Sequence, residues 1–470
     1  MYQIDDQTAA FSVTSAATDL TFLIDSLHQA DDDEVFLYGS SYGTYLVERV
    51  MHLASEKVKG YLVDGVVSES GSSPATRLQF SYWNRNILLP SKRFLELCYE
   101  QKDCPLKFKS KETVLEDVLA MYDEIDKGIE SNSCAKSLML FLETETPSSA
   151  LREFFGLLVR DTWNRALIPS LLVRIHRCND QDIEELSIVM DALVESTVSS
   201  YEAKVDKKQS SPKRQSPLPR NHRHHVQKNQ KKYPSTSSML LPDPIKGTSP
   251  LVYFLIAFSE LWSSPVPSLD ELEGYFKNGV FSEDALNIEI YCLLTGNWNS
   301  SAEESSRDPV CNDVLQRLKT LDGVKANVSL TTKAFVYKPD RFWNQTAPLP
   351  AHASALFFVG ALDFQTPKEF ALAEFEAMKA ATPGDAASQM MLIEFAYGTH
   401  GAGFFPTTPD DETNCGAKIM TSFILNSGDT TKVDTSCIKE LPELSLSDDT
   451  LMELIEELEY GDLIELAGED

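Results

Sequence analysis

Apolar and polar positions near the start of the chain follow two different periods. From about Ser15 to Ala30 apolar residues recur at helical spacing, and the acidic turn DDDE follows. The run from Val35 to Tyr38 is short, apolar and bounded by turn residues, so it predicts a buried strand. A helical pattern over 43–54 and a second strand-like run over 60–67, GYLVDGVV, come next. This order of helix, strand, helix and strand predicts an α/β fold with a parallel sheet.

The pattern is helical from about Gly71 to Val280, where strand signals are few. The helical runs are RFLELCYEQ, ETVLEDVLAMYDEIDKGI, LREFFGLLVRDTW, LIPSLLVRIHR and DIEELSIVMDALVES. The alternation then resumes, because ASALFFVG and QMMLIEFA are typical of strands, a helix begins near Pro367, and AKIMTSFIL is typical of a closing helix. We therefore expect a large helical insertion placed over a sheet.

Two polar segments depart from these patterns. Residues 203–243 are rich in Lys, Arg, Pro, Ser and Gln, so we expect a disordered loop; a basic arm for nucleic acid, heparin or targeting is the alternative. The tail beyond Cys437 is acidic and carries leucines at helical spacing. It either docks on the body or on a partner, or it stays a solvated amphipathic helix. Neither a cysteine nor a spaced carboxylate joins the three histidines of the basic segment, so we expect no metal site at His222, His224 and His225.

Composition narrows the class of protein. With 470 residues and 42% hydrophobic content, the chain is large enough for one large domain with insertions or for several smaller ones. Its formal charge of -29 argues against binding of the whole chain to nucleic acid or to an anionic membrane surface. The richest apolar run, PLVYFLIAFSELW, is too short to cross a bilayer, so we expect no membrane span.

The signals for a cellular compartment conflict. The N-terminal residues MYQIDDQTAAFSV contain neither the basic nor the apolar region of a signal peptide. The chain nevertheless has eight cysteines, and N-x-S/T sequons begin at Asn299, Asn327 and Asn344. Together these features favour an oxidising compartment and a glycoprotein with disulfide bonds.

Residues 39–43, GSSYG, match the G-x-S-x-G pattern of a nucleophile elbow with Ser41 at its centre. In such an elbow a strand enters, a helix leaves, and the serine lies between them on a turn with strained dihedral angles. Small residues two positions before and after the serine avoid a backbone collision, which explains Gly39 and Gly43. The hydroxyl then lies at a helix N-terminus, where the dipole and the amide of Tyr42 face a developing oxyanion.

A serine hydroxyl needs a base, and the base needs an orienting carboxylate. Among the eight histidines, His400 lies directly after the last predicted strand, in the glycine-rich sequence YGTHG. Asp363 follows the preceding strand in FFVGALDFQTP. In α/β hydrolases the order is Ser, acid, His, so we predict the triad Ser41–Asp363–His400, with no cofactor and no metal. The alternative is that Asp363 only caps a helix start and His400 lies on the surface.

The motifs GSSYGTYL, VKGYLVDGVV, GALDFQTP, YGTHG and VDTSCI resemble the prolyl-iminopeptidase/tripeptidyl-aminopeptidase branch of the α/β-hydrolase superfamily, over residues 12–72 and 340–440. The resemblance implies a secreted or vacuolar/lysosomal serine exopeptidase that removes residues from free peptide N-termini. It also implies a helical cap whose carboxylates hold the substrate's amino group, and disulfides Cys98–Cys104 and Cys415–Cys437. The pairing of the remaining cysteines, for which three connectivities exist, stays open for Cys134, Cys178, Cys292 and Cys311.

One part of the family pattern is absent before Ser41. In the family, a signal peptide, several strands and a glycine-rich HGG-type loop precede the helix that begins near Ser15, and that loop donates the second oxyanion amide. No HGG or GG motif occurs upstream of Ser41. We therefore expect a chain that is shortened at its N-terminus or a diverged half-hydrolase. The strand at Val35 is then an exposed edge of the sheet. The missing loop also removes one oxyanion donor, and loss of one such donor typically costs about 10²–10³ in rate.

The combined expectation is a partial α/β-hydrolase fold, mostly parallel, that lacks its N-terminal strands and carries a large helical cap. The expected parts are 1–72 and 340–437 for the hydrolase core, 73–339 for the cap, and 438–470 for the acidic tail. The expected function is peptide hydrolysis from the N-terminus by Ser-His-Asp chemistry. An esterase or lipase acting on a small ester is an alternative, because a triad does not distinguish esters from amides. A non-catalytic hydrolase-like binding protein is another, and the oligomeric state stays open.

Overall fold

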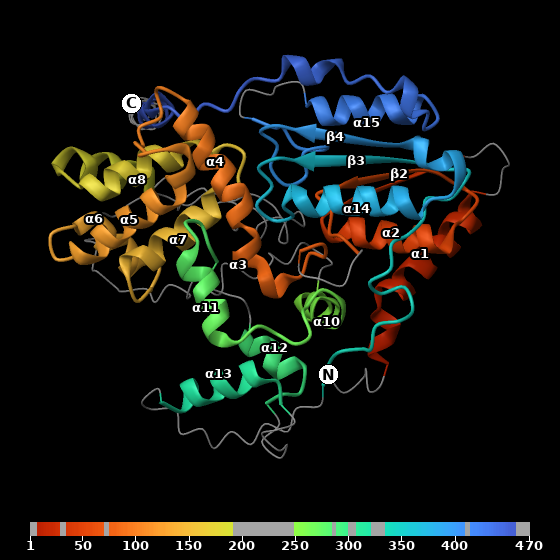
Figure 1. The fold of residues 1–470 in the computed structure, drawn as a ribbon, viewed down its shortest axis with the longest axis horizontal. Coiled ribbons are helices and arrows are strands. Elements are labelled where there is room, and N and C mark those ends of the chain that lie inside the picture. Colours follow the sequence, from red (N-terminus) through yellow and green to blue (C-terminus); the bar gives the residue numbers. More distant parts are fainter. Residues whose placement is uncertain are drawn as a thin grey trace, which may run out of the picture.

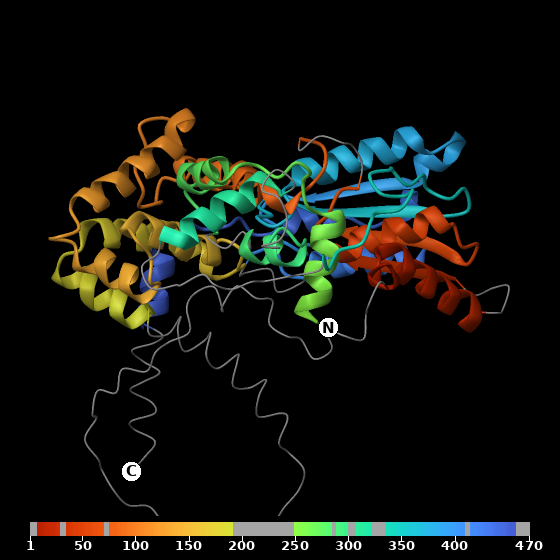
Figure 2. The same ribbon diagram turned by 90° about the horizontal axis from the view of Figure 1, so that it is seen from below.

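A parallel β-sheet and a larger group of helices lie side by side in the computed structural model of the chain (Figure 1). Viewed from below, the two parts form one elongated body (Figure 2). The structure describes residues 7–28, 34–69, 75–190, 249–283, 288–298, 307–320, 334–408 and 414–456. The predicted disordered loop at 203–243, with its three histidines, and the sequons at Asn299 and Asn327 lie outside these ranges.

The sheet has four strands in the order β1-β2-β3-β4, and every pair is parallel. The strands are β1 (Val35–Ser40), β2 (Val58–Asp64), β3 (Ser354–Gly360) and β4 (Met390–Phe395). Every residue of β3 is buried, as is usual for parallel strands covered on both faces. Within the described part of the chain β1 pairs with β2 alone, so the strand that leads to Ser41 is an edge strand, as expected.

Helices cover both faces of the sheet (Figure 1). On one face lie α1 (Val13–Leu27), α2 (Tyr42–Leu53) and α14 (Lys368–Ala381), which share an apolar core with the strands. The other face is covered by α15 (Cys415–Leu425), whose side chains pack on strand residues such as Leu62 and Phe358. The predicted α/β arrangement with a parallel sheet is therefore confirmed.

The second strand is shorter than the sequence pattern suggested. The apolar run predicted a strand as far as Val67, but β2 ends at Asp64. The reason lies in Gly65, which has a φ of 64°, a left-handed conformation that does not continue a strand. The turn at Gly65 places Asp64 at the carboxyl end of the sheet, beside the elbow.

Helices dominate the segment between β2 and β3, as the periodicity predicted. They include α3 (Trp83–Asn86), α4 (Leu88–Glu100), α5 (Val114–Lys127), α6 (Ser133–Phe141), α7 (Pro147–Leu158), α8 (Ile168–Arg177), α10 (Pro250–Glu260), α11 (Leu269–Asn278), α12 (Ile288–Leu294) and α13 (Pro309–Thr320). Residues 180–190 are also helical. Short 3-10 turns lie at Thr8–Phe11, Phe80–Tyr82, Lys111–Thr113, Asn164–Leu167, Gly384–Gln389, Thr430–Lys432 and Ser436–Glu440. The α4–α8 helices share a large apolar core.

The acidic tail docks on the body as far as the structure describes it. Residues 448–456 are helical, and the side chains of Leu451 and Ile455 are buried in the apolar core of α4–α8. The carboxylate of Asp448 also accepts a hydrogen bond of 2.5 Å from Arg174 in α8. Of the alternatives left open by the pattern, the structure supports docking on the chain's own helices.

All eight cysteines form disulfides. The structure pairs Cys98 with Cys104 and Cys415 with Cys437, as the resemblance implies, and it pairs the remaining four as Cys134–Cys178 and Cys292–Cys311. Disulfides are typical of proteins that mature in an oxidising compartment. No helix in the described ranges is both long and apolar enough to cross a bilayer.

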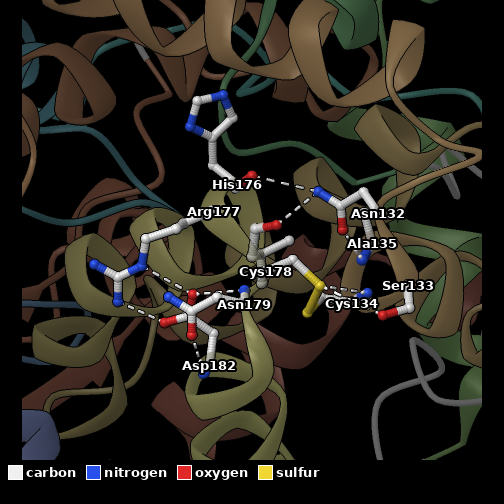
Figure 3. Close-up of a disulfide and its surroundings, with 10 residues drawn as sticks. Asn132, Ser133, Cys134, Ala135, His176, Arg177, Cys178, Asn179 and Asp182 are labelled. Atoms are coloured by element: carbon white, nitrogen blue, oxygen red, sulfur yellow. Dashed lines mark hydrogen bonds and ion pairs between the residues drawn. A yellow bond between two sulfur atoms is a disulfide. The ribbon is translucent and has the colours of Figure 1, made fainter.

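The disulfide between Cys134 and Cys178 joins two helix ends (Figure 3). Cys134 lies in the first turn of α6, and Cys178 caps the C-terminus of α8 with a φ of 45°. The side chain of Asn132 caps α6 by accepting from the amide of Ala135, and its amide nitrogen donates to the carbonyl of Ile175 in α8. The covalent bond and these hydrogen bonds therefore fix the same pair of helix ends.

Candidate active site

The predicted elbow at Ser41 has the backbone conformation that such a turn requires. β1 ends at Ser40, α2 begins at Tyr42, and Ser41 between them has φ 56° and ψ -127°. A non-glycine residue in such a conformation stores about 1–3 kcal/mol of strain, which the surrounding structure must hold. The Ser41 amide donates to the carbonyl of Asp64 at 2.9 Å, and the amide of Thr44 donates to the Ser41 carbonyl at 2.9 Å. The elbow is thus held by β2 on one side and by the first turn of α2 on the other.

The two elbow glycines have different roles. A Cβ atom on Gly39 would lie 2.3 Å from the carbonyl oxygen of Gly43, so no larger residue fits there. A Cβ atom on Gly43 would meet nothing within 4 Å. The expectation that crowding requires glycine at both positions is therefore correct for Gly39 and wrong for Gly43. The close approach is between the Gly39 Cα and the backbone of Gly43.

The amide of Tyr42 lies where the sequence placed the oxyanion donor. Tyr42 is the first residue of α2, so its N–H is one of the helix N-terminal donors that have no acceptor within the helix. The positive end of the helix dipole lies at the same point. The arrangement suits stabilisation of negative charge above Ser41.

Asp363 and His400 form a direct pair. Asp363 comes three residues after the end of β3, His400 lies in the loop after β4, and His400 Nδ1 is 2.9 Å from Asp363 Oδ2. The amides of Gln365 and Thr366 both donate to Asp363 Oδ1 at 2.8 Å, and the Thr366 hydroxyl donates to Oδ2 at 2.6 Å. Burial raises the pKa of Asp363, but the charge of His400 and these hydrogen bonds outweigh it and hold the pKa below its usual value.

The imidazole of His400 lies beside the elbow. A Cβ atom on Gly65 would lie 2.8 Å from two ring atoms of His400, and Gly65 directly follows Asp64, whose carbonyl binds the Ser41 amide. His400 Nε2 is buried and has no hydrogen-bond partner among the described residues, so the Ser41–His400 hydrogen bond is not formed. Such bonds are often long in a free enzyme and shorten when substrate binds.

The charge state of His400 is set by burial and by three charged groups. Burial lowers its pKa, but the negative charge of Asp363, its hydrogen bond and the charge of Asp64 raise it, while Arg160 opposes them. The net effect raises the pKa of His400 above its usual value. The imidazole is therefore suited to accept and hold a proton, as a general base must.

Three other histidines of the described ranges contact groups away from the elbow. The Nε2 atoms of His52 and His352 lie 3.1 Å from the carbonyls of Gln345 and Ser55, and His176 contacts Glu124. Of the predicted triad, the structure pairs Asp363 with His400, whereas Ser41 lies near this pair and has no hydrogen bond to His400. Within the described residues, no group of three or more His, Cys, Asp or Glu side chains could hold a metal ion.

Asp64 is a site residue that the sequence analysis missed. Its side chain is fully buried, and Oδ2 accepts hydrogen bonds from the Tyr38 hydroxyl at 2.8 Å and from the Gly403 amide at 2.9 Å. Burial raises its pKa to about 6, against the hydrogen bond from Tyr38 and the charge of His400. The sequence does contain a signal for it, because Asp64 is a charged residue within the apolar run GYLVDGVV.

A buried ion-pair cluster joins α2 to α10, one of the helices between β2 and β3. Arg49 in α2 contacts the carboxylates of Glu69 and Glu260, and all three side chains are almost wholly buried. Glu260, at the end of α10, also accepts from the hydroxyls of Tyr45 at 3.0 Å and Tyr337 at 2.5 Å. The sequence analysis missed this cluster, although an arginine within the helical run YLVERVMHL was a signal.

The helical segment also holds the loop that carries His400. The guanidinium of Arg165 donates to the carbonyls of Tyr397 and Thr407 at 2.7 and 2.6 Å, at the two ends of this loop. The hydroxyls of Thr162 and Thr399 lie 3.1 Å apart. Because Thr399 precedes His400, the position of the imidazole depends on both parts of the molecule.

Taken together, these contacts place a serine on a strained turn at a helix N-terminus, near a buried histidine paired with a carboxylate. Acyl transfer by a serine nucleophile requires groups of these kinds. In comparisons with known proteins, the chain matches no family model and none of the curated proteins.

Proposed function

We propose that the chain is a serine hydrolase that releases residues from peptide N-termini by acyl-enzyme chemistry. The observation that carries the proposal is the Asp363–His400 pair beside a serine at φ 56°. The resemblance of five motifs to the prolyl-iminopeptidase/tripeptidyl-aminopeptidase branch supplies the peptide substrate class.

In the proposed mechanism, Ser41 Oγ attacks the carbonyl carbon of the scissile bond while His400 Nε2 takes the hydroxyl proton. Asp363 accepts from the Nδ1–H, which keeps the free Nε2 lone pair directed at the serine and stabilises the imidazolium. The Tyr42 amide stabilises the oxyanion. His400 then gives its proton to the leaving amine as the C–N bond breaks, which leaves the acyl group on Ser41. A water molecule, deprotonated by His400, attacks the ester carbon, and His400 returns the proton to Ser41 Oγ as the acid leaves.

We further propose that the helices between β2 and β3 act as a cap that limits access to the site. Support comes from their contacts with the site loops, which include the hydrogen bonds of Arg165 described above. Arg93 in α4 also donates to the carbonyl of Ala361 at 2.7 Å, two residues before Asp363. The four disulfides favour maturation in an oxidising compartment, and a secreted or vacuolar/lysosomal location is part of the proposal.

The test is covalent labelling with a fluorophosphonate probe. We expect labelling of the wild-type chain and none of the Ser41→Ala variant, with mass spectrometry placing the adduct on Ser41. A folded preparation that shows no labelling would contradict the enzymatic proposal. A panel of aminoacyl and acyl chromogenic substrates separates the peptidase from an esterase or lipase, since only a peptidase prefers substrates with a free α-amine.

One observation favours a second candidate, a non-catalytic hydrolase-like binding protein. His400 Nε2 has no partner among the described residues, so the serine is not activated in this conformation. If this candidate is correct, neither the probe nor any substrate of the panel reacts, while peptides still stabilise the fold against heat.

A further inference from the structure

The carboxylate of Asp64 joins three chain segments that form the site. Its Oδ2 atom accepts from Tyr38 in β1, three residues before Ser41, and from the amide of Gly403, three residues after His400. Asp64 itself ends β2 beside the elbow, and its carbonyl accepts the amide of Ser41. One side chain therefore contacts the segment that carries the nucleophile and the loop that carries the base.

The approach of the His400 loop to Asp64 is close. A Cβ atom on Gly403 would lie 3.0 Å from Asp64 Oδ2 and 2.7 Å from the ring of Phe358, so only glycine fits without a shift. The amide of Gly403 can reach the carboxylate because no side chain intervenes. The position of the loop is thus set by the hydrogen bond to Asp64 as well as by the pair with Asp363.

The hydrogen bonds do not require a charge at Asp64. Both donors bind Oδ2, and Oδ1 has no partner among the described residues. The amide oxygen of an asparagine has the lone pairs to accept the same two hydrogen bonds, and burial of an ionised carboxylate costs more than burial of an amide. The additional effect of the carboxylate is electrostatic, and the nearest titratable base is His400.

The charges around this base are few. His400 lies within electrostatic reach of the carboxylates of Asp363 and Asp64, which favour its protonated form, and of the guanidinium of Arg160, which opposes it. Asp64 in turn faces the hydroxyl of Tyr38, His400 and the carboxylate of Asp363. Of the two acids that face His400, Asp363 has its oxygens occupied by hydrogen bonds, whereas Asp64 keeps one oxygen free.

We infer that Asp64 is a positioning residue of the site: a second carboxylate that anchors the His400 loop through Gly403 and stabilises the imidazolium form of His400 by its charge. The inference rests on the proposed function. When Ser41 gives up its proton, the positive charge that develops on His400 is within electrostatic reach of two buried carboxylates instead of one. Removal of the Asp64 charge raises the free energy of that state.

The direct test is the titration of His400 by NMR in the full chain, with histidine labelled at the Cε1 carbon and the signal identified by its absence in His400→Gln. We expect the pKa of His400 to fall in Asp64→Asn, which keeps the acceptor for Tyr38 and Gly403 but removes the charge. The matched control is Asp385→Asn, an exposed aspartate far from the carboxyl end of the sheet, which leaves the His400 titration unchanged. A folded Asp64→Asn protein with an unchanged His400 titration overturns the inference.

The kinetic test measures the rate of fluorophosphonate labelling against pH. In Asp64→Asn we expect the acidic limb to move to lower pH and the plateau rate to fall by about tenfold, equivalent to about 1.4 kcal/mol of lost transition-state stabilisation. A residue with a purely structural role would change the plateau without moving the limb. If the wild-type chain is not labelled at all, the proposed function fails, but the NMR titration still decides the role of Asp64.

A second variant covers the case in which Asp64→Asn does not fold. The hydrogen bond from Tyr38 lowers the pKa of Asp64, so Tyr38→Phe raises it and leaves Asp64 uncharged over more of the range in which His400 titrates. Tyr38 is 38% exposed, so its hydroxyl is removed at small cost to the core. We expect the pKa of His400 to fall in Tyr38→Phe as well, and an unchanged pKa there overturns the inference.

Discussion

The Nδ1 atom of His400 lies 2.9 Å from Oδ2 of Asp363, although the two residues follow different strands of the sheet. The pair forms because β3 and β4 are adjacent and parallel, so the loops at their carboxyl ends meet at the same edge. Ser41 follows β1 at that edge too, and the chemistry proposed here depends on this common placement.

Loss of the Asp363 charge is expected to abolish most activity while the fold survives. In Ser-His-Asp triads, replacement of the acid by its amide costs about 10⁴ in rate, because the imidazole adopts the wrong tautomer. Fluorophosphonate labelling of Asp363→Asn measures this loss, and the exposed Asp385→Asn serves as the control for the change in net charge. Equal labelling of Asp363→Asn and wild type would show that the pair has no part in activation of Ser41.

The pH dependence of activity follows from the sign of the His400 shift. The base must be neutral to accept the proton of Ser41, and its pKa lies above the ordinary value of 6.5 because the two carboxylates outweigh burial and Arg160. As pH falls through that pKa, His400 takes up a proton and the rate declines. We therefore expect the acidic limb of kcat/KM, which reports the free enzyme, to have its midpoint above 6.5. A midpoint below this value would contradict the expectation that the two carboxylates raise the pKa of His400.

The two elbow glycines provide a matched pair of variants. Gly39→Ala places a methyl group 2.3 Å from the Gly43 carbonyl oxygen, and we expect the free energy of unfolding to fall by about 1–3 kcal/mol. Gly43→Ala adds its methyl group in open space within α2, where alanine favours the helix over glycine by about 0.5–1 kcal/mol. Urea unfolding of both variants checks the contrast, and similar losses in the two would contradict the geometry of the elbow.

Arg49 is expected to be essential for stability. Its removal as Arg49→Gln leaves Glu69 and Glu260 without their shared cation in a buried site, and loss of one partner of a buried ion pair typically costs about 3–5 kcal/mol. The control is Arg317→Gln, because Arg317 pairs with Glu273 and the two side chains are 56% and 30% exposed. Exposed pairs contribute about 0–1 kcal/mol, so thermal unfolding should separate the two variants clearly.

The loss of stability on removal of a disulfide should increase with the length of the loop that the disulfide closes. Cys134 and Cys178 are separated by 44 positions and Cys98 and Cys104 by 6, so the chain-entropy model assigns the bridges about 4 and about 2 kcal/mol. We expect the double alanine variant at Cys134 and Cys178 to lose more stability than the double alanine variant at Cys98 and Cys104. Chemical denaturation without reductant measures both, and the reverse order would show that local packing outweighs loop closure.

The elements of the sheet were predictable because each has a simple local pattern. The run at Val35 and the helix after Ser41 have the period, length and turn residues of a strand–turn–helix unit, and β3 and β4 are equally regular. The order of Ser41, Asp363 and His400 along the chain also placed them correctly after their strands. The largest error lies at the end of β2, since the apolar run continues past Gly65 although the strand does not; β1 extends two residues further than predicted, to Ser40.

The polar groups around the site were not predictable in the same way. Asp64 and Arg49 lie in apolar runs, and periodicity shows that they are unusual but not what they contact. Their partners Gly403 and Glu260 come from segments hundreds of positions away, and only the folded chain brings them together. The same holds for Cys134 and Cys178, which pair because two helix ends in one core meet.

The pairing of β2 with β3 has a consequence for how the chain folds. Gly60 is in register with Ser354, so nearly 300 residues, by the numbering of the two partners, must be synthesised before this pairing can form. Closing a loop of that length costs about 5 kcal/mol of chain entropy before any contact compensates for it. Until then, the backbone edge of β2 has no partner, and the apolar side chains of the two strands lack the cover of α14 and α15, which follow β3 in the chain. We therefore expect folding to be slow, to occur late in translation and to depend on chaperones that shield this pair of strands.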